Sequence, residues 1–132
     1  MGKRVGLILR IFLLPLLLIV NTGCIPLIIG TAVGAGGATY LQGSLGKEYN
    51  HPLSETHLAV LRALKNLKLF VKEDELNLNN AKVSFETETG KAGKVSLEAL
   101  TEEHTKIVIR IGFFGDRDKS YMILNALDKE MR

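Results

Sequence analysis

The chain of 132 residues is long enough for one folded domain and little more. Its 17 basic and 14 acidic residues give a formal net charge of +3, but Lys3, Arg4 and Arg10 supply this excess, so the two signs balance from Cys24 onward. This balance argues against a nucleic-acid partner. The single cysteine excludes an internal disulfide and cannot hold a zinc ion alone.

The first 23 residues have the pattern of a secretory signal peptide. Residues 1–10 carry three positive charges and no negative one, and residues 11–20, "IFLLPLLLIV", are apolar throughout. A basic start, a short apolar run and a small residue before the cut define such a signal. The run is short for a membrane-spanning helix, which needs ~20 apolar residues, and Pro15 disfavours a helix there. We therefore predict that residues 1–23 are a signal peptide.

The signal ends in "NTGC", which resembles the lipobox of bacterial lipoproteins. Gly23 and Thr22 match that motif, whereas Asn21 stands where an aliphatic residue is usual. In the lipoproteins the cysteine thiol carries diacylglycerol and the peptide is cut just before it. The resemblance thus implies a lipidated Cys24 and a membrane partner. Because Ile25 is not aspartate, it also implies the periplasmic face of the outer membrane, with the inner membrane as the alternative.

The segment after the cysteine is apolar and rich in glycine. Residues 25–46 contain no charged residue and six glycines. Glycine costs helix propensity in water, roughly 1 kcal/mol per residue relative to alanine. We therefore predict that residues 24–39 are a tether between the lipid and a folded domain of residues 40–132.

An alternative interpretation makes this segment a membrane helix. Gly30, Gly34 and Ala38 lie four residues apart, a spacing that forms a small-residue stripe on a helix and supports self-association. Residues 5–20 and 24–41 would then insert as a helical hairpin with an uncleaved first segment. The positive-inside rule would place the domain in the cytoplasm, on the side of Lys3 and Arg4.

The folded domain begins with an extended segment and a helix. Residues 40–49 alternate with period two, with Leu41, Leu45 and Tyr49 on one face, which predicts a strand. Pro52 ends it. Residues 54–68, "SETHLAVLRALKNLK", predict a helix, and Ser54 is its expected cap. The expected buried stripe comprises Leu53, His57, Val60, Leu61, Leu64 and Leu67.

A further strand is predicted over residues 69–75, and three alternating segments after it predict an antiparallel meander. These are residues 81–89, 94–100 and 105–112, separated by polar or glycine-rich turns. One face of the sheet is apolar and the other carries Ser84, Glu86, Ser96, Glu98 and Arg110. Asp116 should cap a last helix over residues 117–131, with Ile123, Leu124, Leu127 and Met131 buried. The expected fold class is α+β, an antiparallel sheet of four to five strands with two helices packed on one face.

Several of these segments together resemble a family of small bacterial lipoproteins of unknown function, DUF3568. The similar parts are the "YxxG" of Tyr40–Gly43, Tyr49, and above all "IRIGFFGD" at residues 109–116, followed by Ser120. The resemblance implies export and a compact α+β domain. It assigns no catalytic or binding residue.

The remaining candidates for chemistry are weak. His51, His57 and His104 share no metal-ligand spacing. An enzyme would need a convergent polar cluster on the polar sheet face, for instance Glu86, Glu98 and Arg110, which are more simply cross-strand pairs. We therefore predict no catalytic residue, no metal site, no cofactor and no enzymatic activity.

The strand-to-helix turn contains two adjacent phenylalanines. Of Phe113 and Phe114, at least one should point away from the core. An exposed phenylalanine there would contact a protein partner or a membrane. We therefore expect a lipid-anchored envelope protein that acts as a binding or structural module through this turn.

Overall fold

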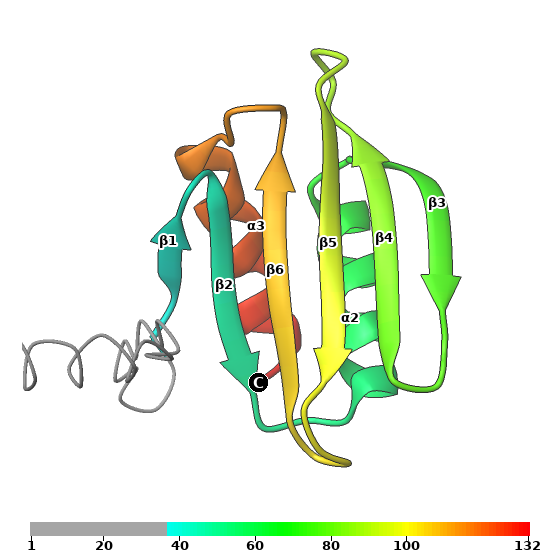
Figure 1. The fold of residues 1–132 in the computed structure, drawn as a ribbon. Helices are drawn as coiled ribbons and strands as arrows, with labels where there is room; N and C mark the ends of the chain where they lie inside the picture. Colours follow the sequence, from blue (N-terminus) through cyan, green and yellow to red (C-terminus); the bar gives the residue numbers. More distant parts are fainter. Residues whose placement is uncertain (1–36) are drawn as a thin grey trace, which may run out of the picture. The chain divides into compact units, whose positions relative to one another are not determined.

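The structure, a computed structural model, describes residues 37–132. Six strands and two helices follow in the order β1 (Thr39–Leu41), β2 (Ser44–Tyr49), α2 (Leu53–Asn66), β3 (Phe70–Leu76), β4 (Asn80–Glu86), β5 (Ala92–Ala99), β6 (Thr105–Ile111) and α3 (Arg117–Glu130) (Figure 1). The predicted α+β class is confirmed. The sheet has six strands rather than four to five.

All neighbouring strands are antiparallel, and their order across the sheet is β1-β2-β6-β5-β4-β3. Strands β4 to β6 form the predicted meander, and β3 extends it by one strand, since each strand turns back beside its predecessor. Strand β2 lies on the other side of β6, and α2 carries the chain from β2 across the sheet to β3 at the opposite edge (Figure 1).

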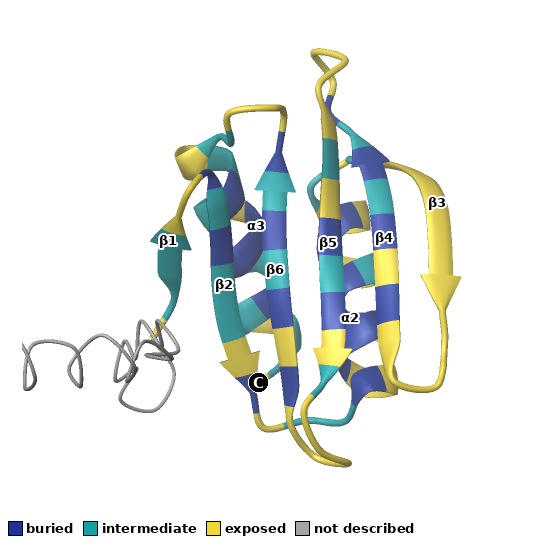
Figure 2. Ribbon diagram, in the orientation of Figure 1, coloured by how far each residue is buried: buried dark blue, intermediate teal, exposed yellow. Residues whose placement is uncertain are grey.

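Both helices cover the same face of the sheet and pack on each other. Helix α3 lies against β2 and β6, and α2 lies against β3, β4 and β5 (Figure 1). Figure 2 shows buried and more exposed residues alternating along β4, β5 and β6. Leu45, Val83, Val95 and Ile109 are fully buried on the helix side, and each such side chain stabilises the fold by ~1.5–3 kcal/mol.

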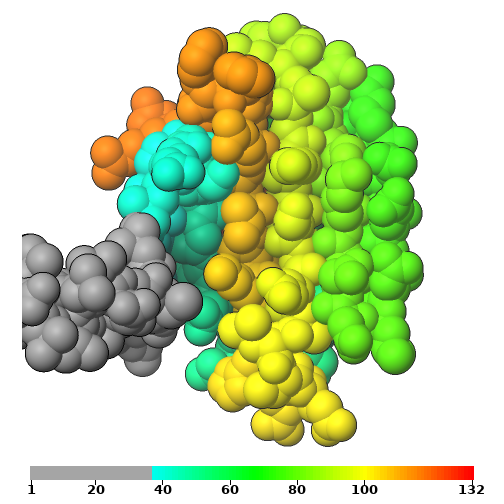
Figure 3. Space-filling model, in the orientation of Figure 1, coloured from blue at the N-terminus to red at the C-terminus, as the bar shows by residue number. Residues whose placement is uncertain are grey.

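The other face of the sheet is polar, as the alternation predicted. Ser84, Glu86, Ser96 and Arg110 are half-buried there and Glu98 is exposed. Figure 3 views the domain from this face, with the chain from β4 to β6 across its middle. Edge strand β3 is exposed along its whole length and carries a bulge between Val71 and Glu73.

The predicted single strand over residues 40–49 is instead a hairpin. Gln42 and Gly43 form a turn at positive φ, and β1 pairs back onto β2. Leu45 and Tyr49 are buried as expected, whereas Leu41 is 48 % exposed. The two-residue turn reverses the alternation, because Leu41 pairs with Ser44 and so lies on the opposite face from Leu45. The apolar residues at positions 41, 45 and 49 keep an even spacing in the sequence, so their pattern did not locate the turn.

The cap predicted for the first helix was wrong. Helix α2 begins at Leu53, one residue earlier than expected, and Pro52 occupies the cap position without a side-chain hydrogen bond. Ser54 therefore lies inside the first turn. The Thr56 hydroxyl donates a hydrogen bond to the Pro52 carbonyl instead. The predicted stripe is buried at Leu53, His57, Val60 and Leu64 and half-buried at Leu61 and Leu67.

Few of the N-terminal predictions fall on the described residues. Residues 1–36, with the signal peptide, Cys24, Gly30 and Gly34, lie outside them. Ala38 is half-buried against the core, and Thr39–Leu41 is a strand, so a helix over the whole of residues 24–41 is excluded. Among residues 37–132, neither helix has the length and hydrophobicity needed to cross a membrane.

Candidate functional site

The turn between β6 and α3 exposes both of its phenylalanines. Phe113 is 83 % exposed and Phe114 is 86 % exposed. Their rings pack edge to face, with centroids 5.0 Å apart and planes at 87°. At least one ring was expected to point away from the core, and both rings do so. We call residues 112–115 the aromatic tip.

A close backbone contact joins the aromatic tip to the β1–β2 turn. Gly43 has φ +79° and Gly115 has φ +84°. A Cβ on Gly115 would lie 2.2 Å from the Gly43 carbonyl oxygen, and a Cβ on Gly43 would lie 2.4 Å from the Phe114 carbonyl oxygen. No side chain fits at either position, because real Cβ atoms do not approach backbone so closely and φ is left-handed at both. The "YxxG" and "GFFGD" segments therefore interlock.

Arg110 bridges the same two turns. Its guanidinium donates hydrogen bonds to the Gln42 carbonyl at 3.1 Å, to the Ser44 hydroxyl at 3.3 Å and to the Phe113 carbonyl. Planar guanidinium donors fix the relative position of their acceptors. Arg110 is thus engaged in holding the tip, and its planar donor group is directed away from the middle of the sheet.

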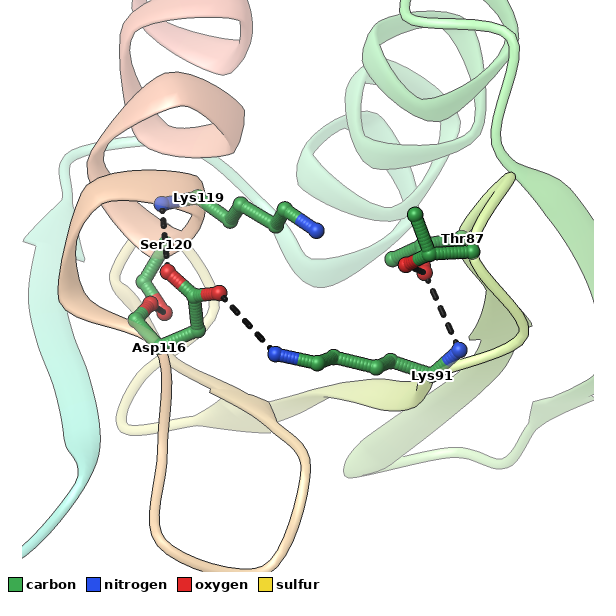
Figure 4. Close-up of polar contacts among 6 residues, drawn as sticks. Thr87, Lys91, Asp116, Lys119 and Ser120 are labelled. Atoms are coloured by element: carbon green, nitrogen blue, oxygen red, sulfur yellow. Dashed lines mark hydrogen bonds and ion pairs between the residues drawn. The ribbon is translucent and has the colours of Figure 1, made fainter.

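Asp116 fixes the other end of the tip. Its carboxylate accepts a hydrogen bond from the Lys119 backbone amide at 3.1 Å and lies 3.8 Å from the Lys91 ammonium (Figure 4). The Ser120 hydroxyl donates to the Asp116 carbonyl at 2.7 Å. The prediction that Asp116 caps the last helix is confirmed. Since Lys91 follows the β4–β5 turn, this turn is tied to the start of α3 as well.

A stacked cation lies next to the tip in sequence. The Arg117 guanidinium lies 5.8 Å from the ring centroids of both Tyr40 and Tyr121, which come from β1 and α3. Such contacts with aromatic faces favour a cation. Strand β1, the tip and α3 are therefore held together by backbone, capping and aromatic contacts.

The three histidines lie in separate polar pairs. His57 Nε2 lies 2.6 Å from Asp74 Oδ1, His51 Nδ1 lies 3.3 Å from Glu55 Oε1, and His104 Nδ1 lies 2.9 Å from Asn50 Oδ1. Within residues 37–132 no group of three or more histidine, cysteine or carboxylate side chains could hold a metal ion. The His57–Asp74 pair joins α2 to the edge strand β3.

The polar cluster considered for an enzyme is not assembled. Glu86 pairs with Ala92 at one end of β5, whereas Glu98 pairs with Asn80 at the other end, about 20 Å away at ~3.3 Å per residue. Glu86 instead forms an ion pair with Lys72 at 3.1 Å. These carboxylates therefore cannot act on one substrate group.

One polar cluster was not found by sequence reasoning. Asp128 of α3 accepts hydrogen bonds from the Lys47 ammonium and the Tyr49 hydroxyl of β2, each at 2.5 Å, and Lys47 lies 4.8 Å from the Tyr49 ring centroid. Burial, and then the hydrogen bond to Asp128, raise the pKa of Tyr49 well above its ordinary value. The sequence contained one indication of this cluster: Lys47 is a charged residue between Leu45 and Tyr49 on the face of the strand that was expected to be buried. The cluster clamps α3 to the sheet.

Most of the chain matches the model of a protein family. No curated protein matches the chain. The model of a family described as "Protein of unknown function (DUF3568)" matches residues 7–130, which include the N-terminal segment, the interlocked turns and both helices. The chain therefore belongs to the DUF3568 family of proteins of unknown function.

Proposed function

We propose that this chain is a lipid-anchored protein of the cell envelope whose folded domain acts as a binding or structural module. The observation that carries the proposal is the order of segments in residues 1–24: three basic residues, an apolar run, then Thr22-Gly23-Cys24. A diacylated and amide-acylated cysteine buries many CH₂ groups at ~0.8 kcal/mol each, which anchors a protein stably. The family match begins at residue 7 and so includes the apolar run and Thr22-Gly23-Cys24.

The strand β1 favours this proposal over the helical hairpin. Because Thr39–Leu41 is a strand, a second membrane helix would be limited to residues 24–38, about 15 residues, whereas a span needs ~20. Pro26 and the glycines weaken a helix there further. The periplasmic face of the outer membrane is the proposed location, on the ground of Ile25.

The folded domain supports a module rather than an enzyme. Asp116 caps α3, Glu86 pairs with Lys72, and Asp128 binds Lys47 and Tyr49. The aromatic tip is exposed and is held by close backbone contact. A fixed apolar projection of this kind is typical of a contact surface. The aromatic tip is therefore the proposed contact site.

Palmitate labelling of cells that express the full chain, followed by mass spectrometry of the mature N-terminus, tests the anchor. We expect a labelled chain that begins at an acylated Cys24. The Cys24→Ala variant should lose the label and leave the membrane fraction, and Asn21→Leu, which restores the usual aliphatic residue, should be processed at least as completely. An unlabelled chain that begins at Met1 would refute the proposal.

A reporter fused after Arg132 tests the side of the membrane. A reporter that is active only in the periplasm should be active in this fusion. Activity of a cytoplasm-dependent reporter instead would support the hairpin with a cytoplasmic domain.

A further inference from the structure

We propose that the aromatic tip inserts into a lipid bilayer surface, so that the domain has a second membrane contact besides the acylated cysteine. The inference rests on the proposed function for the anchor at Cys24. Its own evidence is the exposure, rigidity and composition of the tip and its connection to the strand through which the chain enters the domain.

The tip carries apolar surface that the fold does not use. Phe113 and Phe114 are more than four-fifths exposed, and they pack on each other edge to face. Leu41, which precedes the interlocked β1–β2 turn, is 48 % exposed. Burial of such side chains in hydrocarbon is favourable because it removes apolar area from water.

The tip is held in one conformation before it meets a partner. Gly43 and Gly115 are in backbone contact, Arg110 donates to carbonyls of both turns, and Asp116 caps the helix that follows. A contact site that is already ordered loses little conformational entropy on binding. The two rings can therefore enter an apolar phase without refolding of the loop.

The composition of the tip favours lipid over a protein partner. Its residues Gly112, Phe113, Phe114 and Gly115 have no side-chain hydrogen-bonding group. Specific protein interfaces contain about one hydrogen bond per 100–200 Å², whereas the hydrocarbon of a bilayer offers no such partner and requires none.

The connection to the anchor brings the tip within reach of the membrane. Between Cys24 and the first described residue, Gly37, lie residues 25–36, which span at most ~40 Å when fully extended. Gly37 lies two residues before the start of β1, and the turn after β1 is the one that interlocks with the tip. A domain tethered at Cys24 thus stays within a distance at which the tip can touch the same bilayer.

The absence of tryptophan from the chain permits a direct test. The full chain carrying Phe113→Trp has a single tryptophan at the tip. The matched control is Leu78→Trp, because Leu78 is 92 % exposed in the β3–β4 turn at the opposite end of the sheet. Each variant is purified with its Cys24 acylation verified by mass spectrometry and is reconstituted into vesicles of phosphatidylethanolamine and phosphatidylglycerol, with or without brominated acyl chains.

We expect the tryptophan emission of the Phe113→Trp variant to shift to shorter wavelength and to be quenched by the brominated chains. The emission of the Leu78→Trp variant should do neither. No quenching of the Phe113→Trp variant, or equal quenching of both variants, would overturn the inference about the tip. Because Cys24 is acylated in both preparations, either result would leave the proposed lipid anchor unaffected. A chain that is not acylated in cells refutes the proposed function at the purification step, so the two failures are distinguishable.

Discussion

Replacement of Gly115 by alanine tests whether the interlocked turns stabilise the domain. The new Cβ would lie 2.2 Å from the Gly43 carbonyl oxygen and 2.3 Å from the Gly43 Cα. Neither atom belongs to a flexible side chain, so the β1–β2 turn or the aromatic tip has to move. The variant should therefore lose stability and loosen the tip.

Two costs add up to the expected loss in the free energy of unfolding. A non-glycine residue in the left-handed region costs roughly 1–2 kcal/mol, and overpacking against fixed atoms costs ~1–3 kcal/mol more. Gly115→Ala should thus lower the free energy of unfolding by about 2–5 kcal/mol. Gly112→Ala is the matched control, because Gly112 lies in the same turn at φ +70° with no atom within 4 Å of the added Cβ. Gly112→Ala should therefore show only the cost of the left-handed backbone.

Urea unfolding of residues 37–132 at neutral pH, followed by circular dichroism, measures the difference. With a slope of about 1–2 kcal/mol per molar urea, an extra ~2 kcal/mol separates the two midpoints by about 1–2 M. Equal midpoints for the two variants, with unchanged slopes, would show that the Gly43–Gly115 contact contributes nothing and would refute the reasoning.

Three further predictions concern contacts within the sheet and with the helices. Burial raises the pKa of Tyr49, so the folded protein keeps a proton that the unfolded chain releases above pH ~10. The free energy of unfolding should therefore fall as the pH rises above this value. In urea titrations at several pH values, Tyr49→Phe should remove up to ~1.4 kcal/mol per pH unit of that fall. Asp74→Asn weakens the 2.6 Å contact with His57 of α2 and should lower the free energy of unfolding by ~1–2 kcal/mol, with faster amide exchange in β3. The control Glu75→Gln, on the other face of the same strand, should change neither the free energy nor the exchange rate. Equal amide exchange in the two variants would show that the His57–Asp74 contact does not hold β3. Gly93→Ala places a Cβ 2.4 Å from the Phe85 ring and should lower the free energy of unfolding by ~1–3 kcal/mol. In thermal unfolding, the double variant with Phe85→Leu should lose less free energy than the two single variants together. Strictly additive losses would argue against a contact between the two positions.

Much of the domain follows from local patterns. The alternation in β4, β5 and β6, most of the stripes of α2 and α3, and the Asp116 cap were predicted correctly, because each depends on residues within a few positions of one another. Leu61, Leu67 and Met131 are half-buried rather than buried. Apolar side chains on one face of the sheet then required the helices to cover that face. The exposure of at least one tip phenylalanine also followed, since adjacent residues in a turn cannot both enter the core.

Other features depend on residues that are distant in sequence. The turn at Gln42–Gly43 escaped notice because the apolar residues on either side of it keep an even spacing in the sequence, although the turn puts Leu41 and Leu45 on opposite faces. The cap at Ser54 was misplaced because helix α2 begins at Leu53, with Pro52 at the cap position. The clamp between Tyr49 and Asp128 joins residues 79 positions apart. No local pattern encodes such a pair.

The amino-acid sequence by itself determined the α+β class, the faces of the strands and helices, and the N-terminal segment on which the proposed anchor depends. Only the tertiary structure decided that β2 lies between β1 and β6, that Gly43 meets Gly115, and that Arg110 holds both turns. The reason is physical. Periodicity and capping are set by neighbours along the chain, whereas strand order and backbone contacts are set by the packing of the whole sheet against its helices. The rigid aromatic tip arises from that packing.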